Sequence, residues 1–81
     1  PSAAQTAIGF SVPSAGNVRL QVYDMSGRLV STVHDGEMAA GAHQMVWDGT
    51  NGAGEAVSDG VYLYRLQTPQ GTRVRSCVLM R

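Results

Sequence analysis

The sequence has no lysine, a single cysteine and no long apolar run. Six arginines balance six acidic residues, so the net charge is zero and no overall field attracts nucleic acid or an anionic membrane surface. A single cysteine cannot form a disulfide within the chain. The apolar runs are only a few residues long, whereas a membrane-spanning helix needs about 20. These features exclude nucleic-acid binding, membrane insertion and an internal disulfide.

The length of 81 residues is that of one small domain, and a hydrophobic content of 43% is typical of a folded chain. A chain this short buries only about 60% of its unfolded surface, so its core leaves little room for a deep active-site pocket. The chain begins at Pro1 rather than at a methionine. We therefore expect residues 1–81 to be a single domain taken from a longer secreted protein.

Apolar residues alternate with polar ones along most of the chain, which is the periodicity of half-buried β-strands. Turn-forming residues recur between these segments at the spacing typical of a β-sandwich. The predicted strands cover residues 8–12, 18–23, 28–34, 43–47, 61–68 and 72–81, with a further short segment at 56–57. The sequence therefore predicts an all-β fold, an immunoglobulin-like or fibronectin type III-like antiparallel β-sandwich of six to seven strands.

Three local features refine this prediction. Residues 24–27 indicate a tight turn in which Gly27 has a positive φ. Residues 28–34 do not alternate cleanly, which indicates a bulge or an edge position, and we expect a loop at residues 35–41. The pair Asn51-Gly52 is typical of a tight turn in which both central residues have positive φ.

The apolar faces of the predicted strands define an expected core. Its centre should be Trp47, Tyr62 and Tyr64. The full expected set is Ile8, Phe10, Val12, Leu20, Val22, Trp47, Tyr62, Tyr64 and Leu66. An alternative role for Tyr23, Tyr62 and Tyr64 is a platform for stacking sugars, but packing in the core is the commoner role of such aromatics.

No residue pattern typical of catalysis is found, so we expect neither an enzyme nor a bound cofactor. His34 and His43 lie in different predicted strands and lack the spacing of zinc ligands. We therefore expect His43 to be packed or hydrogen-bonded rather than a metal ligand. Cys77 lies in an apolar stretch, and we interpret it as a small buried hydrophobe rather than a reactive thiol.

The glycine-rich loop at residues 48–59 carries several oxygen-bearing side chains, which are Asp48, Asn51, Glu55 and Asp59. Calcium favours such loops, but the spacing differs from that of an EF-hand. We therefore expect these side chains to cap turns, with a calcium site as the alternative.

The last predicted strand is basic. Arg73 and Arg75 share one side of it, and Arg81 lies farther along. One hypothesis is that these arginines form a recognition strand for another protein. From physical chemistry alone we favour a second role, in which charges on an edge strand discourage pairing with other sheets.

The chain resembles a family of immunoglobulin-like C-terminal modules over nearly its whole length. The first strand, residues 8–13, matches the opening strand of this family. The remaining matches are short motifs in a fixed order, and the ordered set is specific although each motif alone is weak. They are Tyr23-Asp24, Gly27-Arg28, Val30, Gly36, Ala40-Gly41, His43, Trp47-Asp48-Gly49, Gly54, Val57, Gly60-Val61-Tyr62 and Tyr64-Arg65-Leu66.

This family has two branches. One is the C-terminal sorting domain of cargo proteins of the type IX secretion system, and the other is the immunoglobulin-like domain of the flagellar hook-capping protein. The run at residues 60–65 and the hydrophobic and basic last strand resemble the first branch more closely. The resemblance implies a non-catalytic module of a larger bacterial protein, recognised by the export machinery and found in the secreted protein or at the cell surface after passage through the periplasm.

The first hypothesis is therefore a sorting or anchoring domain whose partner is secretion or surface-attachment machinery. The second is a structural assembly domain, like that of a flagellar cap or surface filament, whose partners are neighbouring subunits. The third is a carbohydrate-binding accessory module, which requires exposed coplanar aromatic side chains.

Overall fold

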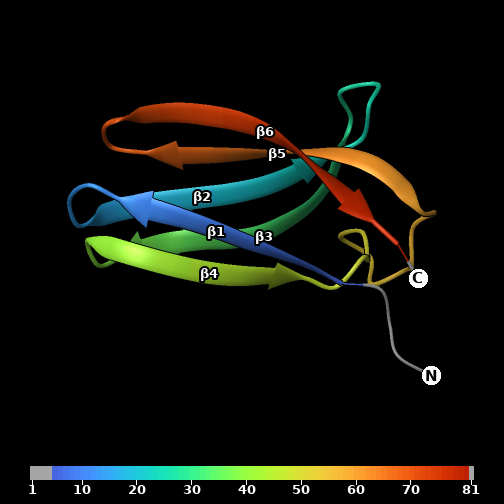
Figure 1. The fold of residues 1–81 in the computed structure, drawn as a ribbon, viewed down its shortest axis with the longest axis horizontal. Coiled ribbons are helices and arrows are strands. Elements are labelled where there is room, and N and C mark those ends of the chain that lie inside the picture. The colour runs from blue at the N-terminus through green and yellow to red at the C-terminus, as the bar shows by residue number, and fades with distance from the viewer. Residues whose placement is uncertain (1–4, 81) are drawn as a thin grey trace.

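A computed structural model describes residues 5–80 of the chain and shows six strands in two antiparallel sheets (Figure 1). The strands are β1 (Thr6–Val12), β2 (Gly16–Tyr23), β3 (Leu29–Met38), β4 (Gly41–Trp47), β5 (Gly60–Thr68) and β6 (Gly71–Leu79). Strands β1 and β4 form one sheet, and the other has the order β3-β2-β5-β6. The fold is thus the predicted immunoglobulin-like sandwich. In residues 5–80 no helix has the length and apolar character needed to cross a membrane.

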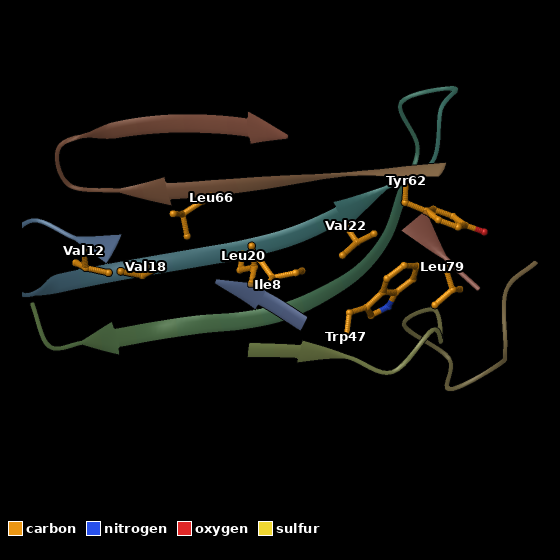
Figure 2. Close-up of a cluster of buried hydrophobic side chains, with 9 residues drawn as sticks. All are labelled: Ile8, Val12, Val18, Leu20, Val22, Trp47, Tyr62, Leu66 and Leu79. Carbon is orange, nitrogen blue, oxygen red and sulfur yellow. The ribbon is translucent and has the colours of Figure 1, made fainter. Parts of the chain in front are cut away.

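The core lies between the two sheets and is apolar (Figure 2). Strand β2 contributes three consecutive inward positions that are fully buried, as its alternation predicts. The buried side chains of the described residues are Ile8, Val12, Val18, Leu20, Val22, Trp47, Tyr62, Leu66 and Leu79. Most of the predicted core is therefore confirmed.

The predicted core differs from the observed one at two kinds of position. Phe10 and Tyr64 pack against the core but are only half-buried. Val18 and Leu79 are fully buried although neither was in the predicted set. The half-buried pair lies where the sandwich is open, so their outer parts remain accessible.

Trp47 and Tyr62 are packed together at one end of the core. Trp47 is only 1% exposed, and its indole meets the Tyr62 ring in a T-shaped contact with centroids 5.0 Å apart. The Trp47 Nε1 donates a hydrogen bond of 2.9 Å to the Thr50 carbonyl. The Tyr62 hydroxyl donates one of 2.5 Å to the carbonyl of Ser58, four residues upstream. Both polar groups thus have hydrogen-bond partners in the loop at residues 48–59.

Strand β3 is longer than predicted, because the expected loop at residues 35–41 is largely strand. Pairing with β2 continues to Gly16 opposite Met38, and only residues 39–40 connect β3 to β4. The charged residues Asp35 and Glu37 fit in this longer strand, because β3 lies at an edge of the sheet and both side chains are exposed to solvent. The predicted irregularity of this strand is confirmed by two shifts of register against β2, at Leu20/Gln21 and Val22/Tyr23.

The prediction for the Asn51-Gly52 pair is wrong, since neither residue has a positive φ. The Asn51 side-chain oxygen instead accepts hydrogen bonds from the backbone nitrogens of Ala53 (2.9 Å) and Glu55 (3.1 Å). The positive φ falls on Gly54, at 82°. Side-chain capping thus replaced the turn type that the dipeptide suggested. The prediction for Gly27 is confirmed, with φ of 90°.

Candidate functional site

Strand β6 forms a free edge of the four-stranded sheet. It pairs with β5 on one side and with no strand of residues 5–80 on the other. Its first six residues, Gly71 to Ser76, are all exposed. Free backbone groups along such an edge are able to pair with another extended chain. This confirms that the basic strand predicted from the sequence lies at an edge.

Arg73 and Arg75 project from β6 toward the inner side of the sheet. Arg73 lies opposite Leu66 and Arg75 opposite Tyr64, and residues directly opposite in an antiparallel pair share a face. Leu66 is buried in the core, whereas both arginines are exposed. The two cations therefore stand on the core-facing side of the sheet, beyond the part that the second sheet covers.

A groove lies between the edge strands of the two sheets. Its lining residues come from β1, β5, β6 and the turns that follow β1 and β5, and they are Gly9, Phe10, Ser11, Pro13, Tyr64, Leu66, Thr68, Gln70, Gly71, Thr72, Arg73 and Arg75. Phe10, Tyr64 and Leu66 supply the apolar part of the lining, and the arginines line it on the β6 side. Figure 1 shows β1 in front of the four-stranded sheet and β6 along its edge.

Hydrogen bonds join the two sheets at both ends of this groove. At one end the Thr6 hydroxyl donates to the Val78 carbonyl over 2.9 Å. At the other end the Gln70 side-chain amide donates to the Ser14 hydroxyl, which joins the β5–β6 turn to the β1–β2 turn. The open stretch between these contacts is where Arg73 and Arg75 lie. Sequence reasoning missed both contacts, because they join residues 56 or more positions apart.

The arginines of the groove have no acidic partner among residues 5–80. The ion pairs in this part of the chain join Arg19 to Asp35 (3.5 Å) and Arg28 to Asp24 (3.9 Å). All four of these charged side chains lie away from the groove lining. The groove is thus a locally positive site on a chain of zero net charge. Arg81, the third predicted recognition residue, lies outside the described residues.

The outer face of the same sheet carries a second polar cluster that the sequence did not reveal. The Arg65 guanidinium lies 5.4 Å from the centre of the Tyr23 ring. Its Nη2 donates to the Gln21 side-chain oxygen (3.1 Å), which also accepts from the Tyr23 hydroxyl (3.0 Å). Only the pairing of β2 with β5 brings these residues together. Arg65 is therefore held in place by these contacts.

The three tyrosines considered as a sugar platform do not share a surface. Tyr62 is buried, and Tyr64 is half-buried on the same inner face. Tyr23 lies opposite Leu63 on the outer face, beneath the Arg65 guanidinium. A coplanar, exposed set of aromatic rings is therefore not formed by these residues, and the carbohydrate-binding alternative loses its structural basis.

His43 is packed and hydrogen-bonded, as predicted. Its ring stacks on Phe10 with centroids 5.8 Å apart, and its Nε2 lies 2.6 Å from the Ala39 carbonyl oxygen. His34 Nε2 lies 3.3 Å from the carbonyl oxygen of Gly36. Cys77 is half-buried against the core, and burial raises the pKa of its thiol, which is consistent with its predicted role as a hydrophobe.

The oxygen-bearing side chains of the loop at residues 48–59 serve local turns. The Asp48 carboxylate accepts from the Thr50 backbone nitrogen (3.1 Å) and hydroxyl (2.6 Å). Asn51 caps the next turn as described above, and its amide donates to Glu55 (3.3 Å). Within residues 5–80 no cluster of three or more histidine, cysteine or acidic residues is placed to hold a metal ion. The capping interpretation is confirmed for Asp48 and Asn51.

Comparison with known families gives one match that covers most of the chain. The sequence model of the FlgD Ig-like domain family matches residues 2–72. Basal-body rod modification protein FlgD of Escherichia coli (strain K12) is 33% identical over 58 residues, which are 72% of this chain. The protein of the same name from Salmonella typhimurium is 35% identical over 57 residues, or 70% of this chain.

Two solved structures share the fold. The crystal structure of FlgD from P. aeruginosa aligns with a TM-score of 0.74 and 28% identity, over 93% of this chain and 57% of that one. FlgD from Xanthomonas campestris aligns with a TM-score of 0.69 and 24% identity, over 96% of this chain and 56% of that one. This second likeness supports the fold alone. The chain spans a quarter of the length of the curated relatives, 25% in each case.

Proposed function

The chain belongs to the family of FlgD immunoglobulin-like domains, and from this premise we propose that it is a structural assembly domain of a longer bacterial protein. The domain itself is non-catalytic, as expected from the sequence. Its task is to hold neighbouring protein subunits during construction of an extracellular structure. The match of the family model to residues 2–72 carries this proposal.

The relatives indicate the kind of structure concerned. The Xanthomonas campestris protein is described by its hook capping, which is essential for flagellar assembly. The Escherichia coli relative is a basal-body rod modification protein. Those functions belong to the relatives, and their transfer to this chain is part of the proposal. The family match and the Escherichia coli relative support the assembly alternative more strongly than the sorting function that the sequence resemblance placed first.

The surface through which the domain meets its neighbour is, in this proposal, the β6 edge with Arg73 and Arg75. An assembly domain must expose a surface that another subunit can bind, and a free strand edge provides backbone donors and acceptors. Strand β6 offers six consecutive exposed residues for this purpose. The two arginines add charge that distinguishes one partner from another.

A second candidate is the sorting function, in which the export machinery of the type IX secretion system recognises the same strand. The observation in its favour is the exposure of β6, since a sorting signal must be readable by another protein. Both candidates place the domain outside the cytoplasm after export. They differ in what happens to the longer protein when the domain is missing.

The test is to replace residues 5–80 in the longer protein, in its own host, by an unrelated immunoglobulin-like domain of similar size. The replacement keeps the spacing between neighbouring parts of the protein. We expect the altered protein to be exported while the extracellular structure fails to assemble. Retention of the altered protein in the periplasm would instead support sorting, and normal assembly would contradict the proposed function. Cell fractionation and electron microscopy of the cell surface measure the two outcomes.

A further inference from the structure

The β6 edge and the groove beside it have features that define the chemistry of a binding partner. The strand has nine residues, one free edge and two exposed cations on alternate positions. These cations face the groove and have no acidic partner within residues 5–80. On the opposite, outer face Val74 and Val78 are 57% and 53% exposed. The edge is therefore basic on its inner side, and on its outer side exposed valines alternate with Thr72 and Ser76.

We propose that this edge takes up an extended acidic segment of a partner protein, which adds to the four-stranded sheet beside β6. The segment carries two carboxylates two residues apart, opposite Arg73 and Arg75, with an apolar residue between them beside Val74. This inference rests on the proposed function, because it names the chemistry by which the assembly domain recognises its neighbour.

The two-residue spacing follows from strand geometry. Side chains on alternate positions of a strand share a face, so Arg73 and Arg75 project together. Directly opposite side chains on a neighbouring strand have Cβ atoms about 4.5–5.5 Å apart, and opposite charges at that distance attract. Carboxylates at alternate positions of the added strand would meet both arginines at once. Backbone hydrogen bonds along the edge would supply the remaining affinity.

The groove gives room for the inward-facing side chains of such a segment. Its lining combines the apolar surfaces of Phe10 and Leu66 with the polar edge of Ser11. The carboxylate of a glutamate on the added strand can reach the arginine opposite it on the same face. The hydrogen bonds at Thr6 and Gln70 hold the two ends of the groove together, so the site exists before the segment binds.

A second copy of this chain is a poor occupant of the same edge. Antiparallel pairing of two β6 strands centred on Val74 would place Arg73 of one copy opposite Arg75 of the other, and like charges directly opposite are destabilising. The exposed acids of β3 do not solve this problem. If β3 of a second copy paired antiparallel with β6, the inner faces of the two sheets would lie on the same side, so acids would be needed on the inner face of β3. Asp35 lies opposite Arg19, on the outer face. The edge therefore favours a different, acidic partner.

The probe for this proposal is a capped synthetic peptide with the core Thr-Val-Glu-Val-Glu-Val-Thr. Its matched control has glutamine in place of both glutamates. Each peptide is titrated into the ¹⁵N-labelled 81-residue chain, and the amide shifts are followed by NMR. We expect the glutamate peptide to shift amides of β6 and of the groove lining, with a dissociation constant about tenfold lower than that of the glutamine peptide. Added salt should reduce the difference.

Two double variants with equal net charge separate a local effect from a general one. R73Q/R75Q removes the groove cations, and R19Q/R28Q removes two arginines elsewhere. We expect only R73Q/R75Q to abolish the preference for the glutamate peptide, with both variants keeping the native NMR spectrum outside the substituted sites. Equal affinity for the two peptides, the absence of binding by the glutamate peptide, or equal effects of the two variants would overturn the proposal.

The domain-replacement experiment distinguishes this inference from the proposed function. If replacement stops assembly but the peptides are not discriminated, the assembly role stands and the acidic partner is wrong. If the peptides bind as expected but assembly survives the replacement, the acidic site stands and the proposed function is wrong.

Discussion

Arg75 lies directly opposite Tyr64 across the β5–β6 pair, so a cation and a core-packed aromatic side chain project from the same side of one sheet. Tyr64 is half-buried and Arg75 is exposed, because the two strands of the second sheet leave this part of β6 uncovered. Inward-pointing charges on an edge strand discourage indiscriminate pairing. The same charges permit pairing with a strand of opposite charge, so edge protection and recognition are compatible roles here.

Trp47→Ala should destabilise the domain by about 3–5 kcal/mol, the usual cost of truncating a buried large aromatic side chain. The change also removes the contact with Tyr62 and the hydrogen bond to Thr50. Urea unfolding measures the effect. Val46→Ala is the matched control, because Val46 is next to Trp47 in the chain but is 52% exposed. A loss below about 1 kcal/mol for Trp47→Ala would contradict the central place of this residue in the core.

Gly16→Ala should destabilise the domain by about 1–3 kcal/mol through overpacking. A Cβ atom at Gly16 would lie 2.6 Å from the Cγ of Pro69, in the stiff ring of the neighbouring turn. Gly9→Ala is the control, because a Cβ there meets nothing within 4 Å and Gly9 has no positive φ. Thermal unfolding of both variants tests the prediction. Equal stability of the two variants would show that Gly16 and the turn that contains Pro69 are not tightly packed against each other.

Asp24 should give the domain a dependence on acid pH. Hydrogen bonds from the Ser26 hydroxyl and then from the Arg28 backbone nitrogen lower its pKa below the ordinary value of 3.8. A lowered folded-state pKa stabilises the fold above the unfolded-state value and loses this effect as pH falls through the folded-state value. Asp24→Asn keeps an acceptor oxygen but removes the charge, so its stability should fall less steeply below pH 3.8. The melting temperature of both proteins is measured against pH, together with an NMR titration of Asp24. An identical fall in melting temperature at low pH for the two proteins would refute the prediction.

Cys77 should react slowly with iodoacetamide in the native chain. Burial raises the pKa of its thiol, and the thiolate is the reactive form. The control is a Cys77→Ala, Val74→Cys variant. It moves the thiol to position 74, where the native valine is 57% exposed. Labelling followed by mass spectrometry compares the two rates. Equally fast labelling of both thiols would show that Cys77 does not pack against the core as described.

The alternation of apolar residues predicted most of the fold, because each strand has one face against the core. It placed Val22, Trp47 and Leu66 correctly. It underestimated β3, because the polar stretch with Asp35 and Glu37 is stabilised as strand by pairing with β2 rather than by its own composition. The Asn51-Gly52 dipeptide predicted the wrong turn type, because the Asn51 side-chain acceptor competed with the backbone preference of the dipeptide.

The candidate site was only half predictable. The sequence placed Arg73 and Arg75 on one side of a terminal strand, and the structure confirms that this strand is an edge. The groove and the contact between Ser14 and Gln70 were not predictable, because they depend on how the two sheets pack. The alternation of side chains along the last strand does give one usable signal. It places the arginines on the same face as Cys77 and Leu79, which indicates that they face the inside of the sandwich.

The central claim is that the β6 edge is where the domain meets a neighbouring subunit. The most direct measurement is site-specific photocrosslinking in the host, with p-benzoylphenylalanine in place of Val74 in the longer protein. Met25, which is 65% exposed in the β2–β3 turn, provides the control position. We expect position 74 to form an adduct with a subunit of the extracellular structure, and position 25 to form none. This structure is the one whose assembly fails in the domain-replacement experiment. The absence of any adduct at position 74, equal adducts from both positions, or an adduct only with the export machinery would contradict the central claim.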